Sequence, residues 1–362
     1  MMEKTLPEVC IIQYGFPFDS SKFCSAEGVP LVRIRDVVRG YSETYTTEIA
    51  GENYIVNDGD LLIGMDGEFN IAYWKGGRAY LNQRVCRLIP REDVDRDYIF
   101  YYMPQALKAI EDATPFVTVK HLSAKQLSKI LIPLPDMREQ QRISAVLRSV
   151  DRVIAMRKKE LDELNHLVKS RFIELFGDPV TNPYGWQQLT VNDVCISVVR
   201  GPFGSALKKE FFVPPSETTY KVYEQKHAIQ KSSTIGTYYV TAEKYNELRR
   251  FECRSGDILM SCSGTMGELY QLPAGCERGI INQALCKFTL NERILPIAFL
   301  AYMRETIGNL ETKGSGIQNI AAVSYVKALP INLPPMRVQE QFAAFVEQTD
   351  KSKLCGKMEV AA

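Results

Sequence analysis

The sequence predicts a mixed α/β (α+β) fold with two pseudo-symmetric domains joined by long helices that form an antiparallel coiled coil. One observation is that a set of short motifs occurs twice, about two hundred residues apart. A second is that the hydrophobic spacing changes, between the two copies, from the two-residue period of strands to a seven-residue period. The repeat is far longer than the roughly 20–50 residues of a solenoid unit. Each copy is therefore a whole domain followed by a helix.

The clearest repeated motif leads from each domain into its helix. Residues 134–141 read Leu-Pro-Asp-Met-Arg-Glu-Gln-Gln, and residues 333–341 read Leu-Pro-Pro-Met-Arg-Val-Gln-Glu-Gln. The other repeated motifs are Thr-Leu-Pro-Glu-Val-Cys-Ile at 5–11 with Thr-Val-Asn-Asp-Val-Cys-Ile at 190–196, Gly-Asp-Leu-Leu at 59–62 with Gly-Asp-Ile-Leu at 256–259, and Asn-Gln-Arg-Val-Cys at 82–86 with Asn-Gln-Ala-Leu-Cys at 282–286. Their constant order indicates one ancestral unit with loop insertions.

Each copy has the same predicted order of elements. Runs rich in β-branched and aromatic residues, bounded by Gly, Asn and Asp, predict the strands. In residues 1–135 the predicted elements are strands at 54–56, 60–64 and 84–89, a helix at 97–109 and a strand at 130–132. In residues 178–335 they are a turn and then a strand within 252–260, a strand at 284–290, a helix at 296–307 and a strand at 329–333.

Residues 136–177 are predicted to form one long helix. Asp136 can cap its start, and Gly-Asp-Pro at 177–179 ends it. At about 1.5 Å per residue, forty helical residues extend roughly 60 Å. The helix packs either on a neighbouring domain or against a second, antiparallel helix. Its heptad positions are Ile143, Val150, Arg157, Leu164 and Arg171 in one row, and Leu147, Ile154, Leu161, Val168 and Leu175 in the other.

Residues 336–362 are predicted to form a second, shortened spacer helix. Phe342 and Val346 continue the apolar row, but Lys353 and Gly356 then fall on core positions. An antiparallel pairing would cover the helix near 157–175 only. We therefore expect Ile143, Leu147, Val150 and Ile154 to need another partner, because an apolar row is costly to leave in water.

Composition excludes several classes of function. The chain has 362 residues, 45% of them hydrophobic, and a net charge of +1. No apolar run approaches the roughly 20 residues of a membrane span, and the first residues lack a signal-segment pattern, so we expect a cytoplasmic protein that does not bind membranes. Nine cysteines without a Cys-x-x-Cys pair and three histidines do not predict a metal site.

No catalytic motif is present in the sequence. It lacks a phosphate-binding Gly-x-x-x-x-Gly-Lys-Ser/Thr loop, a Gly-x-Gly-x-x-Gly turn and a Gly-x-Ser-x-Gly elbow. Asn-Pro-Tyr-Gly at 182–185 lacks the second proline of the Asn-Pro-Pro-Tyr signature of amino-methyltransferases and is interpreted as a turn. We predict no catalytic residue and no enzyme activity for this chain.

In combination these motifs resemble the specificity subunit of type I restriction-modification systems. The resemblance covers almost the whole chain and includes Phe-Gly-Asp-Pro at 176–179 and Asn-Pro-Tyr-Gly-Trp at 182–186, which close the first helix. It implies two target-recognition domains, 1–135 and 178–335, each reading one half of a split double-stranded DNA site. The helices 136–177 and 336–362 would act as a ruler between them.

The resemblance also implies protein partners. Methyltransferase (M) subunits would dock on the helices and methylate adenine, and a restriction (R) subunit would add ATP-driven translocation and cleavage. S-adenosylmethionine, ATP and Mg are therefore expected on partner subunits, with no cofactor on this chain.

Candidate DNA contacts are basic and amide side chains in each domain, among which phosphate contacts usually outnumber base contacts. In the first domain they are Lys22, Arg33, Arg35, Arg39, Lys75, Arg78 and Lys120, with Tyr41 and Tyr45 nearby. In the second they are Arg200, Lys208, Lys209, Lys221, Gln225, Lys226, Lys231, Gln318 and Asn319.

Three hypotheses stay open. The first domain lacks the Gly-Trp that precedes the second at 185–186, and the second helix is short. The chain is a working or slightly truncated specificity subunit, a spare cassette that dimerises through 143–154, or a coiled-coil adaptor that binds only protein. The sequence does not specify the bases recognised.

Overall fold

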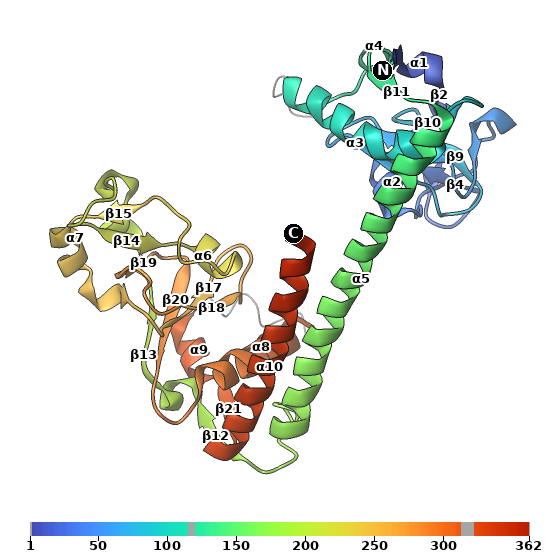
Figure 1. The fold of residues 1–362 in the computed structure, drawn as a ribbon. Coiled ribbons are helices and arrows are strands. Elements are labelled where there is room, and N and C mark those ends of the chain that lie inside the picture. The colour runs from blue at the N-terminus through green and yellow to red at the C-terminus, as the bar shows by residue number, and fades with distance from the viewer. Residues whose placement is uncertain (1, 115–119, 313–321, 362) are drawn as a thin grey trace. The chain divides into compact units, whose positions relative to one another are not determined.

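The computed structural model describes residues 2–114, 120–312 and 322–361 (Figure 1). Two compact units comprise Met1–Met156 and Arg157–Ala362. The boundary between them falls inside one continuous helix, α5 (Met137–Phe176). We call the elements from β1 to β11 the first domain and those from β12 to β21 the second domain.

The first domain contains two sheets and a strand pair. The strand orders are β2-β10-β7-β8 and β3-β5-β4-β9-β6, and β1 pairs antiparallel with β11. Its strands are β1 (Met2–Thr5), β2 (Cys10–Tyr14), β3 (Phe23–Cys24), β4 (Val29–Val32), β5 (Tyr45–Thr46), β6 (Ile55–Val56), β7 (Leu61–Gly64), β8 (Asn70–Tyr73), β9 (Ala79–Leu81), β10 (Val85–Pro90) and β11 (Leu131–Leu134). Its helices are α1 (Leu6–Val9), α2 (Ile34–Arg39), α3 (Arg96–Ala113) and α4 (Ala124–Ser128), with 3-10 turns at Ser20–Lys22 and Glu52–Tyr54.

The second domain repeats this architecture. Its strand orders are β13-β20-β17-β18 and β15-β14-β19-β16, and β12 pairs antiparallel with β21. Its strands are β12 (Gln187–Thr190), β13 (Cys195–Arg200), β14 (Tyr220–Tyr223), β15 (Tyr239–Val240), β16 (Glu252–Cys253), β17 (Ile258–Ser261), β18 (Leu269–Gln271), β19 (Gly279–Ile281), β20 (Leu285–Leu290) and β21 (Pro330–Leu333). Its helices are α6 (Gln225–Ile229), α7 (Ala242–Glu247), α8 (Pro296–Thr312) and α9 (Val323–Ala328), with 3-10 turns at Val191–Val194, Gly204–Leu207, Lys209–Phe211 and Arg249–Phe251.

Strands β7 and β17, which lie inside their sheets, are buried on both faces. Leu61 and Ile63 of β7 pack with α3, whereas Leu62 packs with Trp74 on the other face. This alternation follows from the two-residue period of a strand. In β17, Met260 packs with α8 and Leu259 packs towards the second sheet in the same way. The continuous apolar runs in the sequence are therefore strands that pack on two sides.

The repeated Leu-Pro-x-Met-Arg motif supplies a buried glutamine that fixes the start of the preceding helix. Gln140 Oε1 accepts a hydrogen bond from Asp95 N at 2.8 Å, and its Nε2 donates to Pro135 O at 2.9 Å. Gln339 does the same with Leu295 N at 2.8 Å and Pro334 O at 3.0 Å. Both glutamines are 1% exposed. The motif joins domain and helix because each buried amide satisfies backbone groups of both.

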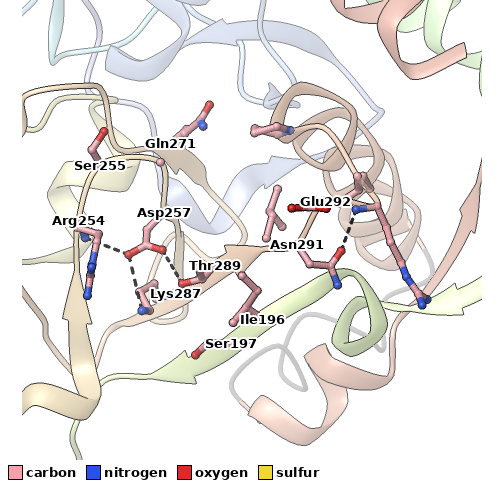
Figure 2. Close-up of a pocket in the computed structure, with 15 residues that line it drawn as sticks. Ile196, Ser197, Arg254, Ser255, Asp257, Gln271, Lys287, Thr289, Asn291 and Glu292 are labelled. Atoms are coloured by element: carbon pink, nitrogen blue, oxygen red, sulfur yellow. Dashed lines mark hydrogen bonds and ion pairs between the residues drawn. The ribbon is translucent and has the colours of Figure 1, made fainter. Parts of the chain in front are cut away.

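The repeated Gly-Asp motif supplies a carboxylate that organises a turn, buried at Asp257 and half-buried at Asp60. Asp257 accepts a hydrogen bond from Arg254 N at 3.0 Å and from Thr289 Oγ1 at 2.5 Å, with Lys287 Nζ at 3.7 Å (Figure 2). In the first domain, Asp60 accepts one from the backbone of Asn57, which corresponds to Arg254, at 2.8 Å. The aspartates therefore stabilise the turns that lead into β7 and β17.

Helix α10 (Met336–Ala361) runs antiparallel to the C-terminal part of α5 (Figure 1). Phe342, near the start of α10, lies 5.8 Å from Phe172 and 5.3 Å from Phe176, near the end of α5, between ring centroids. All three rings belong to the second-domain core, and Val346 joins them. The sequence prediction of an antiparallel helix pair agrees with these contacts.

The apolar positions of α5 have three different environments. Val168 and Leu175 pack against the second-domain core, and Ile154, Leu161 and Leu164 are half-buried. Leu147 and Val150 are 37% and 48% exposed. Ile143, which was expected to need a partner other than the second helix, packs against the first-domain core.

Candidate nucleic-acid interface

The repeated Asn-Gln motif forms a turn that connects the two sheets of each domain. In the first domain, Asn82 N donates to Val32 O at 3.3 Å and Gln83 N donates to Phe16 O at 3.0 Å. In the second domain, Asn282 N donates to Tyr223 O at 3.0 Å. Both turns lie between the last strand of one sheet and the central strand β10 or β20 of the other. A side chain on this turn is therefore held by a rigid scaffold.

A glycine in each domain allows the chain to pass this turn closely. A Cβ on Gly15 would lie 2.1 Å from Asn82 O, and a Cβ on Gly201 would lie 1.9 Å from Asn282 O. No side chain fits at those distances, so only glycine permits the contact. Sequence reasoning did not identify these two glycines, although each stands directly after β2 or β13.

Beside the first turn is a hollow of about 510 Å³, which we call the first-domain hollow. Its lining residues are Phe18, Ser20, Phe23, Arg33, Ile34, Arg35, Asn82, Gln83 and Arg84. Three of these are arginines and none is acidic, so the lining residues themselves carry three positive charges. Arg33 and Arg35 were predicted DNA contacts; Gln83 and Arg84 were missed, although the Asn-Gln motif itself was recognised.

The arginines of the hollow are differently constrained. Among the described residues Arg33 has no carboxylate partner, and its guanidinium carbon lies 5.9 Å from the Phe23 ring centroid. Arg35 Nη2 donates to Thr44 Oγ1 at 3.2 Å. Arg84 Nε lies 3.5 Å from Asp66 Oδ2. Of the three guanidinium groups in the hollow, that of Arg33 therefore has the fewest polar contacts among the described residues.

The other first-domain candidates lie outside the lining of this hollow and mostly have partners. Lys22 lies 3.9 Å from Glu48, Arg39 lies 2.8 Å from Glu43 and 5.1 Å from the Tyr41 ring, Arg78 donates to both oxygens of Glu52, Lys120 donates to Glu111 O at 2.6 Å, and Lys75 is exposed. Tyr45 is half-buried in β5. Exposed ion pairs of this kind are weak, so DNA phosphates can compete for these cations.

In the second domain the turn is surrounded by a different set, which we call the second-domain turn cluster: Arg200, Phe203, Gln225 and Gln283. Arg200 Nε donates to Gln283 O at 3.1 Å, and its guanidinium carbon lies 5.0 Å from the Phe203 ring centroid. Gln225 Nε2 donates to Ser263 O and to Thr265 O, the latter at 3.3 Å. Of this cluster, sequence reasoning named Arg200 and Gln225.

The remaining second-domain candidates lie in varied environments. Lys226 lies 2.8 Å from Glu224 and 5.4 Å from the Tyr238 ring, Lys208 lies 3.6 Å from Glu210, Lys231 lies 2.5 Å from Glu268, and Lys209 is exposed. Gln318 and Asn319 lie outside the described residues.

Lys221 is a correction to the predicted interface. Its side chain is buried and its Nζ lies 2.8 Å from Glu277 Oε1. Burial alone would raise the pKa of Glu277, but hydrogen bonds from Lys221 and Tyr239 outweigh it and lower that pKa. Lys221 therefore neutralises the Glu277 carboxylate, which is exposed, while its own side chain is buried and lies outside the candidate interface.

A buried histidine supports the helix beside the second turn. His227 Nδ1 accepts from Glu224 N at 2.9 Å, and its Nε2 donates to Ile235 O at 2.7 Å. Burial lowers the pKa of His227, so the neutral ring fits both bonds. In the first domain Asp36 accepts from Arg33 N at 2.9 Å at the corresponding helix position. Both side chains fix the first turn of their helix, α6 or α2.

A second hollow of about 960 Å³ lies in the second domain, at the end of β20 that is remote from the Asn-Gln turn. Strand β20 begins beside that turn at Leu285 and ends at Leu290, which lines the hollow. In the first domain Arg96 occupies the corresponding place and donates to Gly59 O at 3.1 Å. Pro296 replaces that arginine, so α8 leaves the space open. Figure 2 shows Asp257, Gln271, Lys287, Asn291 and Glu292 among its lining residues.

The family model for the type I restriction modification DNA specificity domain matches residues 1–166 and 183–356. The chain belongs to this specificity-domain family. Both copies of the repeat fall within the match, so each domain with its turn is a specificity domain. No described helix is long and apolar enough to cross a membrane. The described residues contain no group of three or more His, Cys, Asp or Glu that could hold a metal ion.

Relatives and solved structures of specificity subunits agree with this assignment. The chain is 40% identical over 167 residues to the EcoBI specificity subunit of Escherichia coli, covering 46% of this chain and 35% of that protein. It is 24% identical over 178 residues to the MjaVIII specificity subunit of Methanocaldococcus jannaschii, covering 46% and 42%. The matches therefore span less than half the length of either curated relative.

Two solved structures share the fold across the whole chain. The S subunit of a type I restriction-modification system from M. genitalium has a TM-score of 0.52 at 12% identity, covering 99% of this chain and 92% of that chain. A chain from a study of complex assembly and conformational transition of the type I R-M system has a TM-score of 0.57 at 17% identity, covering 99% and 92%. At these identities the likeness shows only that the fold is shared.

Proposed function

We propose that this chain is the DNA sequence-specificity subunit of a type I restriction-modification complex. It binds a bipartite double-stranded DNA target, with one half-site read by each domain, and it positions methyltransferase and restriction subunits without catalysing a reaction. The observation that carries the proposal is the placement of a supported Asn-Gln turn with cationic neighbours at the same position in both specificity domains.

The chemistry of the two turns suits different half-sites. Arg33, Arg35 and Arg84 can donate to phosphates or to the O6 and N7 acceptors of guanine in the major groove. Both turns carry a glutamine, Gln83 and Gln283, whose amide can pair with adenine N6 and N7. The side chains around the two turns differ, so the two domains would read two different sequences.

The helices would set the distance between the half-sites and carry the partners. Near its start, helix α5 packs against the first-domain core through Ile143. Near its end, it packs in the second-domain core through Phe172 and Phe176. We propose that α5 and α10 form an antiparallel coiled coil and that the exposed Leu147 and Val150 dock a methyltransferase subunit. S-adenosylmethionine, ATP and Mg would be bound by the partner subunits in the cytoplasm.

Methylome sequencing tests the proposal directly. A host that carries this chain with its methyltransferase should show adenine methylation at a bipartite motif that disappears when the chain is deleted. In mobility-shift assays the assembled complex should bind that motif selectively at moderate salt. A methylome unchanged by the deletion, or a complex without sequence selectivity, would contradict the proposal.

The exposure of Leu147 and Val150 also favours a second candidate, a specificity subunit that pairs with another copy of itself through this part of α5. A concentration-dependent dimer, measured by sedimentation and lost in Leu147→Asp, supports this alternative. A wild-type chain that stays monomeric over the concentrations at which the complex assembles excludes it. A protein-only adaptor would instead leave the recognised half-site unchanged after a domain swap.

A further inference from the structure

Phe203 is an aromatic side chain left in solvent beside the second-domain turn. It is 65% exposed, and it follows Gly201 and Pro202 directly after β13. The corresponding segment of the first domain carries Phe18, which is 5% exposed and packs against Tyr80 at 5.1 Å between centroids. The two domains therefore use an aromatic ring in opposite ways: one buries it beneath the first-domain hollow, and the other presents it on the surface.

The Phe203 ring is held in place rather than loosely attached. The Arg200 guanidinium carbon lies 5.0 Å from the ring centroid, and Arg200 Nε donates to Gln283 O at 3.1 Å. A cation over an aromatic face is attracted by the ring quadrupole. Pro202 restricts the backbone before the ring, and Gly204 follows with φ +68. The ring, the guanidinium and the Asn-Gln turn thus form one connected unit.

The side-chain amide of Gln283, on the same turn, can form hydrogen bonds with a base edge. Gln283 is exposed, and its side-chain amide makes no hydrogen bond within the described part of the chain. A free glutamine amide is complementary to the N6 and N7 groups of adenine. In an A·T pair the thymine C5 methyl is exposed in the same groove, and it is the apolar group that phenylalanine contacts.

We propose that Phe203 and Gln283 together read one A·T pair, with the Phe203 ring on the thymine C5 methyl and the Gln283 amide on adenine. The proposal rests on the proposed DNA-binding function and deepens it by naming a base pair and two readers. It assigns the exposed ring a contact that removes apolar surface from water on both partners. The first-domain hollow, with its buried Phe18, would not depend on a thymine methyl in this way.

Deoxyuridine substitution tests the contact, because uracil differs from thymine only by the C5 methyl. The full chain assembled with its methyltransferase subunits is titrated with its methylome-defined target, and each thymine of the second half-site is replaced in turn. One replacement should weaken wild-type binding about fourfold, the factor expected for one buried methyl group. In Phe203→Ala the same replacement should change nothing, whereas Phe203→Leu should retain part of the effect.

Ile196 provides the matched control. It is 74% exposed near the other end of β13, so Ile196→Ala removes an exposed apolar side chain away from the turn and should keep the full uracil effect. An equal uracil effect in wild type and Phe203→Ala overturns the proposal. A second half-site without an A·T pair also overturns it, as does a Phe203→Ala defect confined to assembly with the methyltransferase. A wild-type complex without any sequence selectivity would instead refute the proposed function.

Discussion

The buried glutamine of the Leu-Pro-x-Met-Arg motif predicts a large and local loss of stability on truncation. Gln140→Ala removes the acceptor of Asp95 N and the donors to Pro135 O and Asp93 O, the last at 3.3 Å. Gln141, the next residue, is exposed. Gln141→Ala is therefore a matched control for Gln140→Ala, because it makes the same substitution at an adjacent position that is exposed instead of buried.

The magnitude follows from the three hydrogen bonds. At about 1 kcal/mol net for each, and with buried backbone groups left without partners, Gln140→Ala should lower the free energy of unfolding of the first domain by about 3 kcal/mol. Gln141→Ala should change it by less than about 0.5 kcal/mol, as for most exposed positions. Gln339→Ala should produce the same loss in the second domain, because Gln339 makes the equivalent bonds.

Urea denaturation with tryptophan fluorescence can resolve the two domains. The sequence has two tryptophans: Trp74 is buried in the first domain, and Trp186, next to β12, donates from Nε1 to Phe176 O at 3.0 Å. Trp74→Phe and Trp186→Phe backgrounds isolate the two signals. A Gln140→Ala midpoint equal to that of Gln141→Ala, or an equal shift of both domains, would refute the assigned role of the motif.

Further predictions concern the turns and α5. Gly201→Ala should destabilise the second domain by a few kcal/mol in urea and weaken DNA binding, because its Cβ would overlap Asn282 O; an unchanged midpoint would exclude this close contact. Burial lowers the pKa of His227, so below about pH 6.5 the folded state binds fewer protons than the unfolded state. The free energy of unfolding of the second domain should therefore fall as the pH falls through that value. His227→Asn should remove this contribution to the pH dependence of the urea midpoint. Arg33→Ala should reduce the slope of log K against log salt by about 0.9, if Arg33 contacts one phosphate; the same slope as wild type would exclude that contact. Leu147→Asp should leave first-domain unfolding within about 0.5 kcal/mol of wild type, since Leu147 is exposed, yet weaken binding of the methyltransferase; unaltered binding by calorimetry would place docking elsewhere.

Local pattern was sufficient for much of the fold. The heptad row predicted a helix over 136–177, and the structure has α5 over Met137–Phe176. The helix predicted at 97–109 extends over Arg96–Ala113 and includes Pro104. The predicted start is one residue from the observed one, where Asp95 caps the helix locally, and Gln140 adds a contact from 45 residues further along the chain.

The candidate interface was harder to predict because it depends on contacts between distant residues. Lys221 was chosen as a basic residue in a polar stretch, but Glu277 faces it from 56 residues further along the chain. Arg84 and Gln83 were within a recognised motif, yet only the fold places them beside Arg33. Phe203 carried no charge signal, and its exposure became visible only beside the buried Phe18.

The pairing of β1 with β11, and of β12 with β21, places the entry and exit of each domain on neighbouring strands. Each domain is therefore a closed cassette whose two chain ends leave side by side. Exchange of such a cassette by recombination would preserve its internal strand pairing. The buried glutamine at the start of the following helix, Gln140 or Gln339, would again form its hydrogen bonds to the domain. Under the proposed function, this architecture would permit the half-site read by one domain to be changed while the other domain stays the same.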